Sequence, residues 1–234
     1  SATIDTATPL NASVIDDGQP NNTAPSVNWT QLQGPSLVNW GSANSIQTTF
    51  SGDTIGTYSL RLIADDSAIK TFNTLNLSVH SAWKGWQIAY FGDPNSSSAD
   101  ALADPNNNGL QNIFEFALGG HPTNEGNSAD ILPVYGLIDN SNDRFLSLTY
   151  RRRTGSGSGN AVSGYTIDGI TYYVEASNSL SNINWLSNSN ELIQVGSPLY
   201  NGDGTESVTV RMQEPIDSTA NTRAFMRLKV QSSE

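Results

Sequence analysis

Oxygen-bearing side chains recur at close, regular spacing between residues 104 and 115. The positions that matter, in chain order, are Asp104, Asn106, Asn108, Gly109, Leu110, Asn112 and Glu115. Carboxylate, amide and carbonyl oxygens are the ligands that Ca²⁺ prefers, and the ion takes about six to eight of them. The spacing D-x-[DN]-x-[DN]-G-x5-E is typical of a loop that wraps around this ion. The sequence therefore predicts a calcium site in this segment.

Each position in the first half of the loop has its own predicted role. Asp104, Asn106 and Asn108 supply side-chain oxygens to the predicted site. Gly109 permits the sharp turn that must follow them, because glycine adopts backbone conformations that other residues avoid. Leu110 has no side-chain oxygen, so its contribution is the backbone carbonyl. This half of the loop therefore provides four candidate ligands.

Asn112 and Glu115 complete the predicted ligand set from the helix that follows the loop. Asn112 acts as a ligand or holds a water molecule, and Glu115 closes the shell with its carboxylate. Only Asp104 and Glu115 carry charge, and fewer carboxylates mean weaker binding. Weak binding suits a structural ion in a calcium-rich extracellular medium better than a cytosolic sensor. An Asn-rich turn that caps a helix is the alternative interpretation.

Two other charged groups have weaker patterns. Asp16–Asp17 and Asp65–Asp66 form acidic pairs beside predicted strand ends, and solvated turns explain them more simply than a second ion site. The only basic run is 151–153, in which strand alternation places Arg151 and Arg153 on one face. This run either balances local acidic residues or contacts an acidic neighbour or a sulfated glycan.

Catalytic groups are scarce in this chain. It has no cysteine and only two histidines, His80 and His121. His121 follows a predicted helix end, where a structural role is common. Glu175 and Glu191 lie on predicted strands, but nothing in the sequence pairs them as an acid and a base. We therefore predict that the protein is not an enzyme.

Charge and composition restrict the partners and the setting. The 234 residues include 11 basic and 22 acidic side chains, a net charge of −11, which argues against nucleic acid or an anionic membrane as partner. No apolar run reaches the roughly 18 residues that a membrane-spanning helix needs. Ser, Thr and Asn replace charged residues, and cysteine is missing. This composition is typical of secreted bacterial proteins, so we expect an extracellular or cell-surface location.

The hydrophobic pattern predicts a mainly β protein with three parts. Residues 1–80 alternate with the period of strands and predict an N-terminal immunoglobulin-like β-sandwich. Residues 81–128 have helical spacing in 83–91 and 110–118, which predicts a short two-helix linker around the calcium loop. Residues 129–234 return to alternation and predict a C-terminal β-sandwich.

The strand predictions depend on alternation between turn signals. Alternation is clearest in 58–64, 71–79, 145–150 and 208–212. The Gly/Ser-rich stretch 154–159 lacks the strand-to-helix context of a phosphate-binding loop. We therefore interpret that stretch as a flexible hairpin loop.

Several residues of the first predicted domain match a known pattern. They are 14–18, Trp29, Gly34, Pro35 and 56–66. Together they resemble PKD-type immunoglobulin-like modules of bacterial surface proteins. The resemblance implies that Trp29 is a central core residue and that Tyr58 forms a tyrosine corner, with its hydroxyl bonded back to the backbone. Sugar stacking is the alternative for both aromatics.

A second resemblance covers the rest of the chain. The segments that carry it are 86–92, 103–122, 146–152, 173–177, 201–206 and 225–228. They resemble the C-terminal region of large secreted proteins from Verrucomicrobia- and Planctomycetes-like bacteria, and the calcium loop resembles those of dockerin and thrombospondin type 3 repeats. This implies an extracellular, non-catalytic surface module without a specified ligand. Because the chain begins at Ser1 without a signal peptide, we expect a segment of a longer protein.

These observations predict a calcium-stabilised structural or adhesive module, whose partners are other copies of itself or neighbouring domains. One version is a self-assembling filament or appendage subunit, with residues 2–8 paired across subunits. An ordinary first strand is the alternative for that stretch. The alternative function is a carbohydrate-binding module of a secreted polysaccharide-degrading enzyme, with polysaccharide as partner. Its candidate aromatic platform residues are Trp40, Trp185, Tyr172 and Tyr200.

Overall fold

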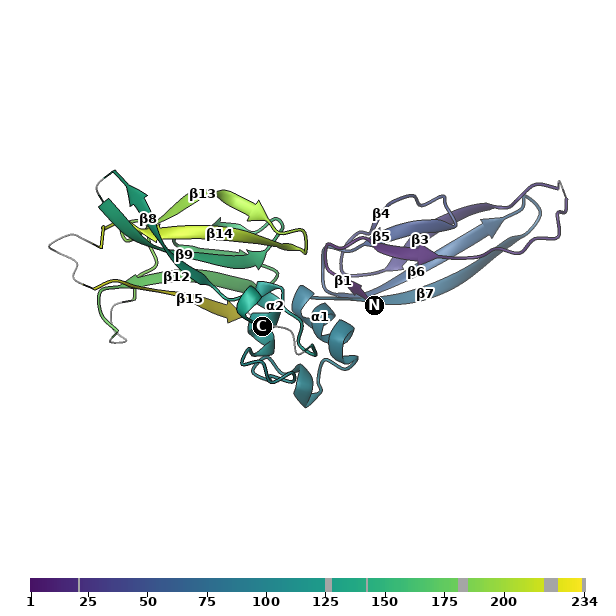
Figure 1. The fold of residues 1–234 in the computed structure, drawn as a ribbon. Coiled ribbons are helices and arrows are strands. Elements are labelled where there is room, and N and C mark those ends of the chain that lie inside the picture. The colour runs from purple at the N-terminus through teal and green to yellow at the C-terminus, as the bar shows by residue number, and fades with distance from the viewer. Residues whose placement is uncertain (21, 125–127, 142, 181–184, 217–222, 233–234) are drawn as a thin grey trace. The chain divides into compact units, whose positions relative to one another are not determined.

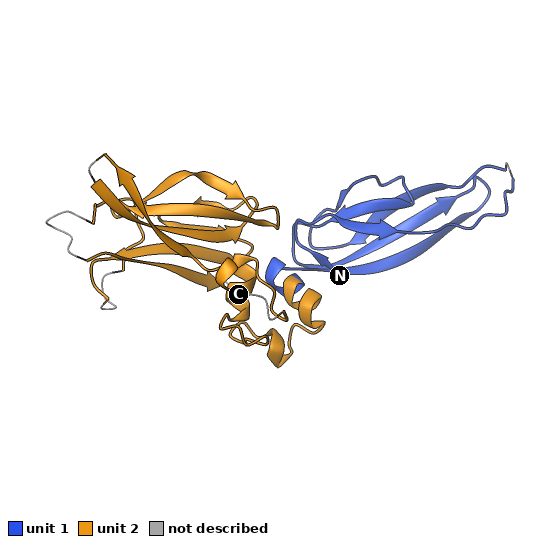
Figure 2. Ribbon diagram, in the orientation of Figure 1, with its two compact units in different colours: residues 1–85 blue, residues 86–234 orange. Residues whose placement is uncertain are grey.

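The chain forms two compact units in a computed structural model, Ser1–Gly85 and Trp86–Glu234 (Figure 2). The structure describes residues 1–234 except 21, 125–127, 142, 181–184, 217–222 and 233–234. Strands dominate both units. The helices all lie in the part of the sequence between the last strand of the first unit and the first strand of the second (Figure 1). The prediction of a mainly β fold, with sandwiches and a short helical segment, is confirmed.

The first unit is a sandwich of two small sheets. Its strands are β1 (Ala2–Thr3), β2 (Thr8–Asn11), β3 (Ser26–Gln33), β4 (Asn39–Trp40), β5 (Gln47–Ser51), β6 (Gly56–Asp65) and β7 (Lys70–His80). One sheet has the order β1-β7-β6-β3 and the other β2-β5-β4. Side chains from both sheets meet in one apolar core, which includes Leu10, Trp29, Phe50, Leu60 and Val79. The predicted alternation of 58–64 and 71–79 thus belongs to the long hairpin β6–β7.

Aromatic side chains fill the centre of this core. Trp29 is 6% exposed, and its indole nitrogen donates to the Ser45 carbonyl at 3.0 Å. Tyr58 is fully buried, and its hydroxyl donates to the Thr54 carbonyl at 2.9 Å. A hydroxyl bonded to the backbone four residues upstream has the geometry of a tyrosine corner. The structural interpretation of Trp29 and Tyr58 is therefore confirmed.

The start of the chain lies in this same unit. β1 pairs in parallel with β7, with Ala2 opposite Val79 and Thr3 opposite His80. Ala2 is buried, and the Ile4 amide donates to the His80 carbonyl at 2.8 Å. In this structure residues 2–3 and Thr8 thus belong to strands of their own sandwich, β1 and β2.

The second unit contains the helices and two four-stranded sheets. Its helical segments are α1 (Ala82–Phe91), which begins in the first unit, η1 (Ser97–Ala99), α2 (Asn112–Leu118) and η2 (Ser128–Asp130). Its strands are β8 (Val134–Asn140), β9 (Asp143–Arg153), β10 (Ser158–Asn160), β11 (Gly164–Ile167), β12 (Ile170–Ser177), β13 (Leu192–Tyr200), β14 (Thr205–Met212) and β15 (Phe225–Ser232). The sheets have the orders β10-β11-β12-β15 and β13-β14-β9-β8. Residues 158–159, predicted as loop, pair with β11 instead.

Large side chains from both sheets fill the core of the second unit. Leu148 and Tyr150 come from β9, Tyr172 and Val174 from β12, and Val208 from β14; all are at most 1% exposed. The alternation predicted for 208–212 is thus explained, because every second residue faces this core, whereas in 145–150 residues of both strand faces are buried. No helix in the described part of the chain is long and apolar enough to cross a bilayer.

Candidate calcium loop

Residues 104–111 form a loop between η1 and α2, as the sequence pattern requires. The loop is closed at its base, where the Asn112 amide donates to the Ala103 carbonyl at 2.8 Å. Two of its residues have left-handed backbone conformations, Asn107 at φ 54° and Gly109 at φ 87°. Asparagine and glycine tolerate this region best. The sequence therefore provides the right residues for a tight loop at the positions where the chain turns.

Three of the predicted ligands bond to amide groups of the loop itself. Asp104 Oδ1 accepts from the Asn108 amide at 3.2 Å, and its Oδ2 accepts from the Gly109 amide at 2.9 Å. Asn106 Oδ1 accepts from the Asn108 amide at 3.3 Å, and Asn108 Oδ1 accepts from the Leu110 amide at 2.9 Å. These bonds fix the three side chains over the loop backbone and bring them together.

Glu115 closes the loop from the first turns of α2. Its side chain is only 1% exposed. Its Oε1 accepts from Asn108 Nδ2 at 2.8 Å and from Asn106 Nδ2 at 3.4 Å. None of the ion pairs between described residues includes Glu115. The hydrogen bonds to this buried carboxylate thus come from two neutral side-chain amides.

A cation is the kind of group that can balance such a carboxylate. Burying a carboxylate away from water without a compensating positive charge costs on the order of several kcal/mol. The surrounding oxygens are hard carboxylate, amide and carbonyl groups, which favour Ca²⁺ or Mg²⁺ over softer metals. No group of three or more His, Cys, Asp and Glu side chains occurs among the described residues. The candidate site depends instead on amides and carbonyls, and the residues present fit a calcium ion.

Asn112 has a different environment from the other predicted ligands. Its side chain is fully buried, and Nδ2 donates to the carbonyls of Ser98 and Asp100, both at 2.8 Å. These two bonds tie α2 to η1, and they orient the amide so that Oδ1 faces the other way. Oδ1 has no hydrogen-bond partner among the described residues. Asn112 thus has a structural role here, and its ligand role stays a prediction.

Two backbone carbonyls beyond α2 also reach the loop. Asn106 Nδ2 donates to the His121 carbonyl at 3.0 Å and to the Asn124 carbonyl at 2.8 Å. The twelve-residue pattern ends at Glu115, so it gives no sign of them. The only local signal is the pair Gly119–Gly120, which ends the helix and lets the chain turn back.

The C-terminal end of α2 is anchored to the sheets of the second unit. The buried Tyr172 hydroxyl donates to the Ala117 carbonyl at 2.7 Å and accepts from the Arg153 amide at 3.2 Å. The Arg153 guanidinium lies over the Phe116 ring, 4.2 Å from its centroid. Helix carbonyls at this end have no partner within the helix, so side chains must satisfy them. The helix that carries Glu115 is therefore attached to both β9 and β12.

The basic run 151–153 pairs with local acidic residues. Arg151 pairs with Asp203, Arg152 with Glu206 at 2.6 Å, and Arg153 with Asp168 at 2.5 Å. Desolvation acts to raise the pKa of Asp203, but hydrogen bonds from Thr205 and Arg151 outweigh it, so this pKa lies below its usual value. The structure therefore favours internal charge balance over an external acidic partner for this run.

The acidic pairs of the first unit are turn residues. Asp16 and Asp17 accept from the amides two residues ahead of each, at 3.1 and 3.0 Å. Asp66 accepts from the Ile69 amide at 2.6 Å, and Asp65 pairs with Lys70 at 2.9 Å. These contacts agree with the interpretation as solvated turns.

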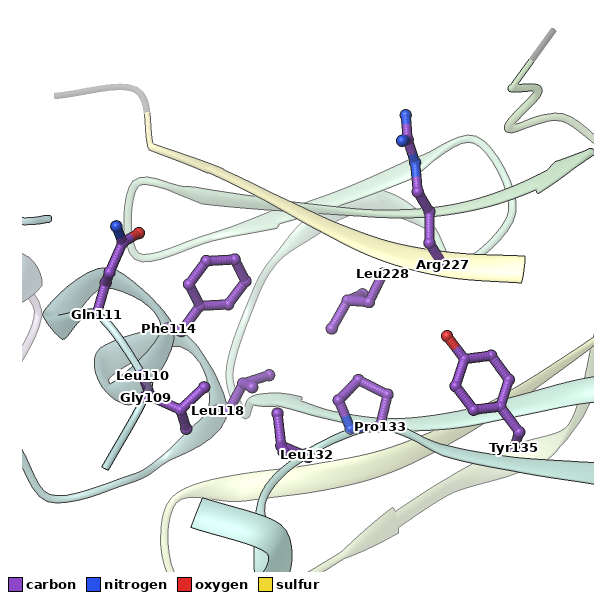
Figure 3. Close-up of a pocket in the computed structure, with 10 residues that line it drawn as sticks. All are labelled: Gly109, Leu110, Gln111, Phe114, Leu118, Leu132, Pro133, Tyr135, Arg227 and Leu228. Carbon is purple, nitrogen blue, oxygen red and sulfur yellow. The ribbon is translucent and has the colours of Figure 1, made fainter. Parts of the chain in front are cut away.

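An apolar pocket of about 500 Å³ lies beside the calcium loop (Figure 3). Its walls are α2 and the loop before it, the segment that leads into β8 together with the start of β8, and β15. The lining is Gly109, Leu110, Gln111, Phe114, Leu118, Leu132, Pro133, Tyr135, Arg227 and Leu228. Aliphatic side chains predominate in this lining, which also includes the aromatic rings of Phe114 and Tyr135.

The four aromatic residues predicted as a sugar platform are mostly covered. Tyr172 is fully buried, so that prediction is wrong for this residue. Trp40 stacks on Trp29 with ring centroids 6.1 Å apart, and the Arg227 guanidinium lies 4.1 Å from the Trp185 ring centroid. Only Tyr200 among the four is widely exposed, at 68%.

Comparisons with known proteins give limited information. No protein-family model matches the chain, and no curated protein matches it. One solved structure that matches is described as the solution structure of the PKD domain from KIAA 1837 protein, with 28% identity. The match covers 33% of this chain and 76% of that one, with a TM-score of 0.27. The sandwich assignment of the first unit therefore depends on its own strands and core.

Proposed function

We propose that this chain is a non-catalytic, calcium-stabilised structural module of a bacterial surface or extracellular assembly. Buried Glu115 carries the argument, because it is enclosed by amides and has no cationic partner among the described residues. Asp104, Asn106 and Asn108 and the Leu110 carbonyl add oxygens around the same loop. A bound ion balances this carboxylate and holds α2 in place.

The proposal has a direct thermodynamic test. Thermal unfolding of the whole chain is measured by calorimetry with calcium and with a chelator. At a calcium concentration of 100 times Kd, a native-state ligand adds about 2.7 kcal/mol to the free energy of unfolding. We expect a higher Tm with calcium, and we expect Glu115→Gln to remove the increase.

A matched control isolates the site. Glu214→Gln makes the same chemical change at an exposed position, and this variant is expected to keep the full calcium effect. An unchanged Tm of the native chain in millimolar calcium would contradict the proposal.

The extracellular setting and the partners are part of the same proposal. The cysteine-free, acidic composition and the resemblance to PKD-type surface modules support it. A weakly charged calcium loop suits a medium in which calcium is abundant. We propose other copies of the chain, or neighbouring domains of a longer surface protein, as partners. Electron microscopy and sedimentation with calcium test self-assembly, and dispersed monomers at high concentration contradict it.

The aromatic residues favour this proposal over a carbohydrate-binding module. Trp40 stacks on Trp29, the Arg227 guanidinium lies over the Trp185 ring, and Tyr172 belongs to the core. Tyr200 alone does not make a platform, because sugar-binding surfaces combine several exposed rings in one plane. A polysaccharide array on which the native chain binds and Tyr200→Ala does not would reverse this preference.

A further inference from the structure

Three oxygen atoms, one from α2 and two from the segment after it, converge on the side chain of Asn106. Its Nδ2 donates to Glu115 Oε1 at 3.4 Å, to the His121 carbonyl at 3.0 Å and to the Asn124 carbonyl at 2.8 Å. The Asn106 Nδ2 atom thus lies among three acceptor oxygens, which share its two protons. Such a cluster of acceptors is an environment that a cation satisfies better than an amide group.

The segment that supplies these carbonyls has a defined path. α2 ends at Gly119, which has φ 78°, and the Gly120 amide donates to the Glu115 carbonyl at 2.7 Å. A Cβ at Gly120 would overlap Glu115 Oε2, so the backbone here packs directly on the carboxylate. The chain then turns back over the loop. The position of this segment is therefore linked to Glu115, the side chain that closes the candidate site.

Neighbouring contacts hold this segment beyond the glycines. Tyr90 packs edge-to-face on the His121 ring with centroids 4.7 Å apart. Pro122 is buried, and the Asn124 amide donates to the His121 carbonyl at 3.3 Å. A carbonyl oxygen has two lone pairs, so His121 can accept this bond and still face the loop.

The loop by itself provides a small ligand set for calcium. Asp104, Asn106, Asn108 and the Leu110 carbonyl offer four oxygens, and Glu115 adds one or two. Calcium takes about six to eight. Asn112 Nδ2 donates to two carbonyls of another segment, whereas its Oδ1 has no hydrogen-bond partner among the described residues, so Asn112 is left out of this count. Two further carbonyls bring the total to the middle or top of this range without Asn112.

We propose that the main-chain carbonyls of His121 and Asn124 are two further calcium ligands, and that residues 119–124 close over the ion. Asn106 turns its amide so that Oδ1, in place of Nδ2, faces the ion and these carbonyls. The site is then a loop plus a covering segment, and it encloses the ion more fully than a loop of twelve residues. This inference rests on the proposed calcium function and adds a specific ligand geometry to it.

The histidine content of the chain allows a direct test by NMR. Labelling with histidine that carries ¹³C at the carbonyl gives two signals in the whole chain, from His80 and His121. His80 lies on β7, and its carbonyl accepts from the Ile4 amide in the first unit, so it serves as an internal control. We expect the His121 signal to shift as calcium is added and to saturate together with the Tm increase. The His80 signal is expected to stay in place.

A second measurement counts the water molecules on the ion. Eu³⁺ replaces Ca²⁺, and its luminescence lifetime in H₂O and D₂O gives the number of bound waters. Gly120→Ala displaces the covering segment through the overlap with Glu115, so we expect about two more waters in this variant than in the native chain. Gly136→Ala, on β8 and with only the Ser147 hydroxyl nearby, is the control and keeps the native count.

The outcomes separate this inference from the function on which it rests. A calcium-dependent Tm increase with an unmoved His121 signal, or with equal water counts in native chain and Gly120→Ala, overturns the two extra ligands and leaves the calcium site intact. A native chain whose Tm does not change with calcium overturns both the calcium function and the two extra ligands. A moving His121 signal together with the lower native water count supports the covering segment.

Discussion

The two units of this chain differ in the kinds of side chain that they bury. In the first unit, aromatic and aliphatic side chains of two small sheets form a single apolar core around Trp29, Phe50 and Tyr58. In the second unit, apolar residues share the interior with buried polar groups, among them Glu115, Asn112 and Arg152. Each of these polar groups has specific partners. The first unit is thus held mainly by shape and area, and the second also by matched charges and hydrogen bonds.

The difference has a thermodynamic meaning. Apolar burial stabilises in proportion to area and tolerates small changes of direction. A buried charge stabilises only when its partner is present, and it destabilises strongly when the partner is removed. The first unit is therefore expected to respond to loss of volume, and the second to loss of a partner. Four measurements test this contrast, from the largest expected effect to the smallest.

Trp29→Ala tests the apolar core of the first unit. Trp29 is 6% exposed and packs on Trp40, so truncation leaves a large cavity. We expect a loss of about 3–5 kcal/mol in the free energy of unfolding of this unit. Hydrogen exchange followed by peptide mass spectrometry reports the two units separately, and the second unit is expected to keep its protection. Ile15→Ala, at a residue 98% exposed, is the control with almost no effect.

Arg152→Met tests the buried ion pair of the second unit. Its side chain is 7% exposed and lies 2.6 Å from Glu206, and its guanidinium stacks on the Tyr165 ring at 3.6 Å. Removing one partner of a buried pair costs about 3–5 kcal/mol, because the other charge stays unbalanced. Denaturant unfolding measures the loss.

A double variant separates partner loss from loss of packing. Arg152→Met with Glu206→Met removes both charges and is expected to recover most of the stability. Equal losses in the single and double variants would show that the second unit depends on shape in the same way as the first.

Alkaline pH tests the buried tyrosines of the second unit. Burial raises the pKa of Tyr150 to about 12 from 10.0, and burial likewise raises the pKa of Tyr172. The neutral phenols are favoured in the folded state, so their contribution is complete below pH 10 and is lost as pH rises through the folded pKa. For Tyr150 this amounts to roughly 2–3 kcal/mol between pH 10 and 12.

Unfolding free energies measured across this range check the prediction. Tyr150→Phe is expected to flatten the alkaline loss in the second unit. A native chain with the same stability at pH 10 and pH 12 would contradict the assignment of these tyrosines to a dry interior.

A pair of hydroxyl deletions gives the smallest expected difference. Tyr58→Phe removes bonds to Thr54 and Ser36, which are exposed or half-exposed, so water replaces them and the cost is about 1 kcal/mol. Tyr172→Phe leaves the buried Ala117 carbonyl without its donor, which costs about 1–3 kcal/mol. Chemical unfolding of both variants compares the two losses. A larger loss for Tyr58→Phe would reverse the contrast between the units.

Local sequence patterns were sufficient for much of this architecture. Alternation in 58–64 and 208–212 predicted strands because buried residues alternate there with more exposed ones. The tyrosine corner was visible because its partner, Thr54, lies only four residues away. The polar residues of the loop at 104, 106 and 108 came together for the same reason, since their spacing and the backbone turn are encoded in one short segment.

Tertiary structure alone decided the contacts between distant segments. Tyr172 was a candidate sugar platform because strand alternation does not say which face is covered, and the fold placed it in the core against α2. The salt bridges of 151–153 join β9 to β11–β12 and β14, which no local pattern relates. Every residue type has a backbone carbonyl, so no sequence pattern marks those of His121 and Asn124. Only the path of the backbone after Gly119–Gly120 brings them to the loop. The sequence by itself determined the oxygens that side chains supply, and the fold decided which backbone oxygens join them.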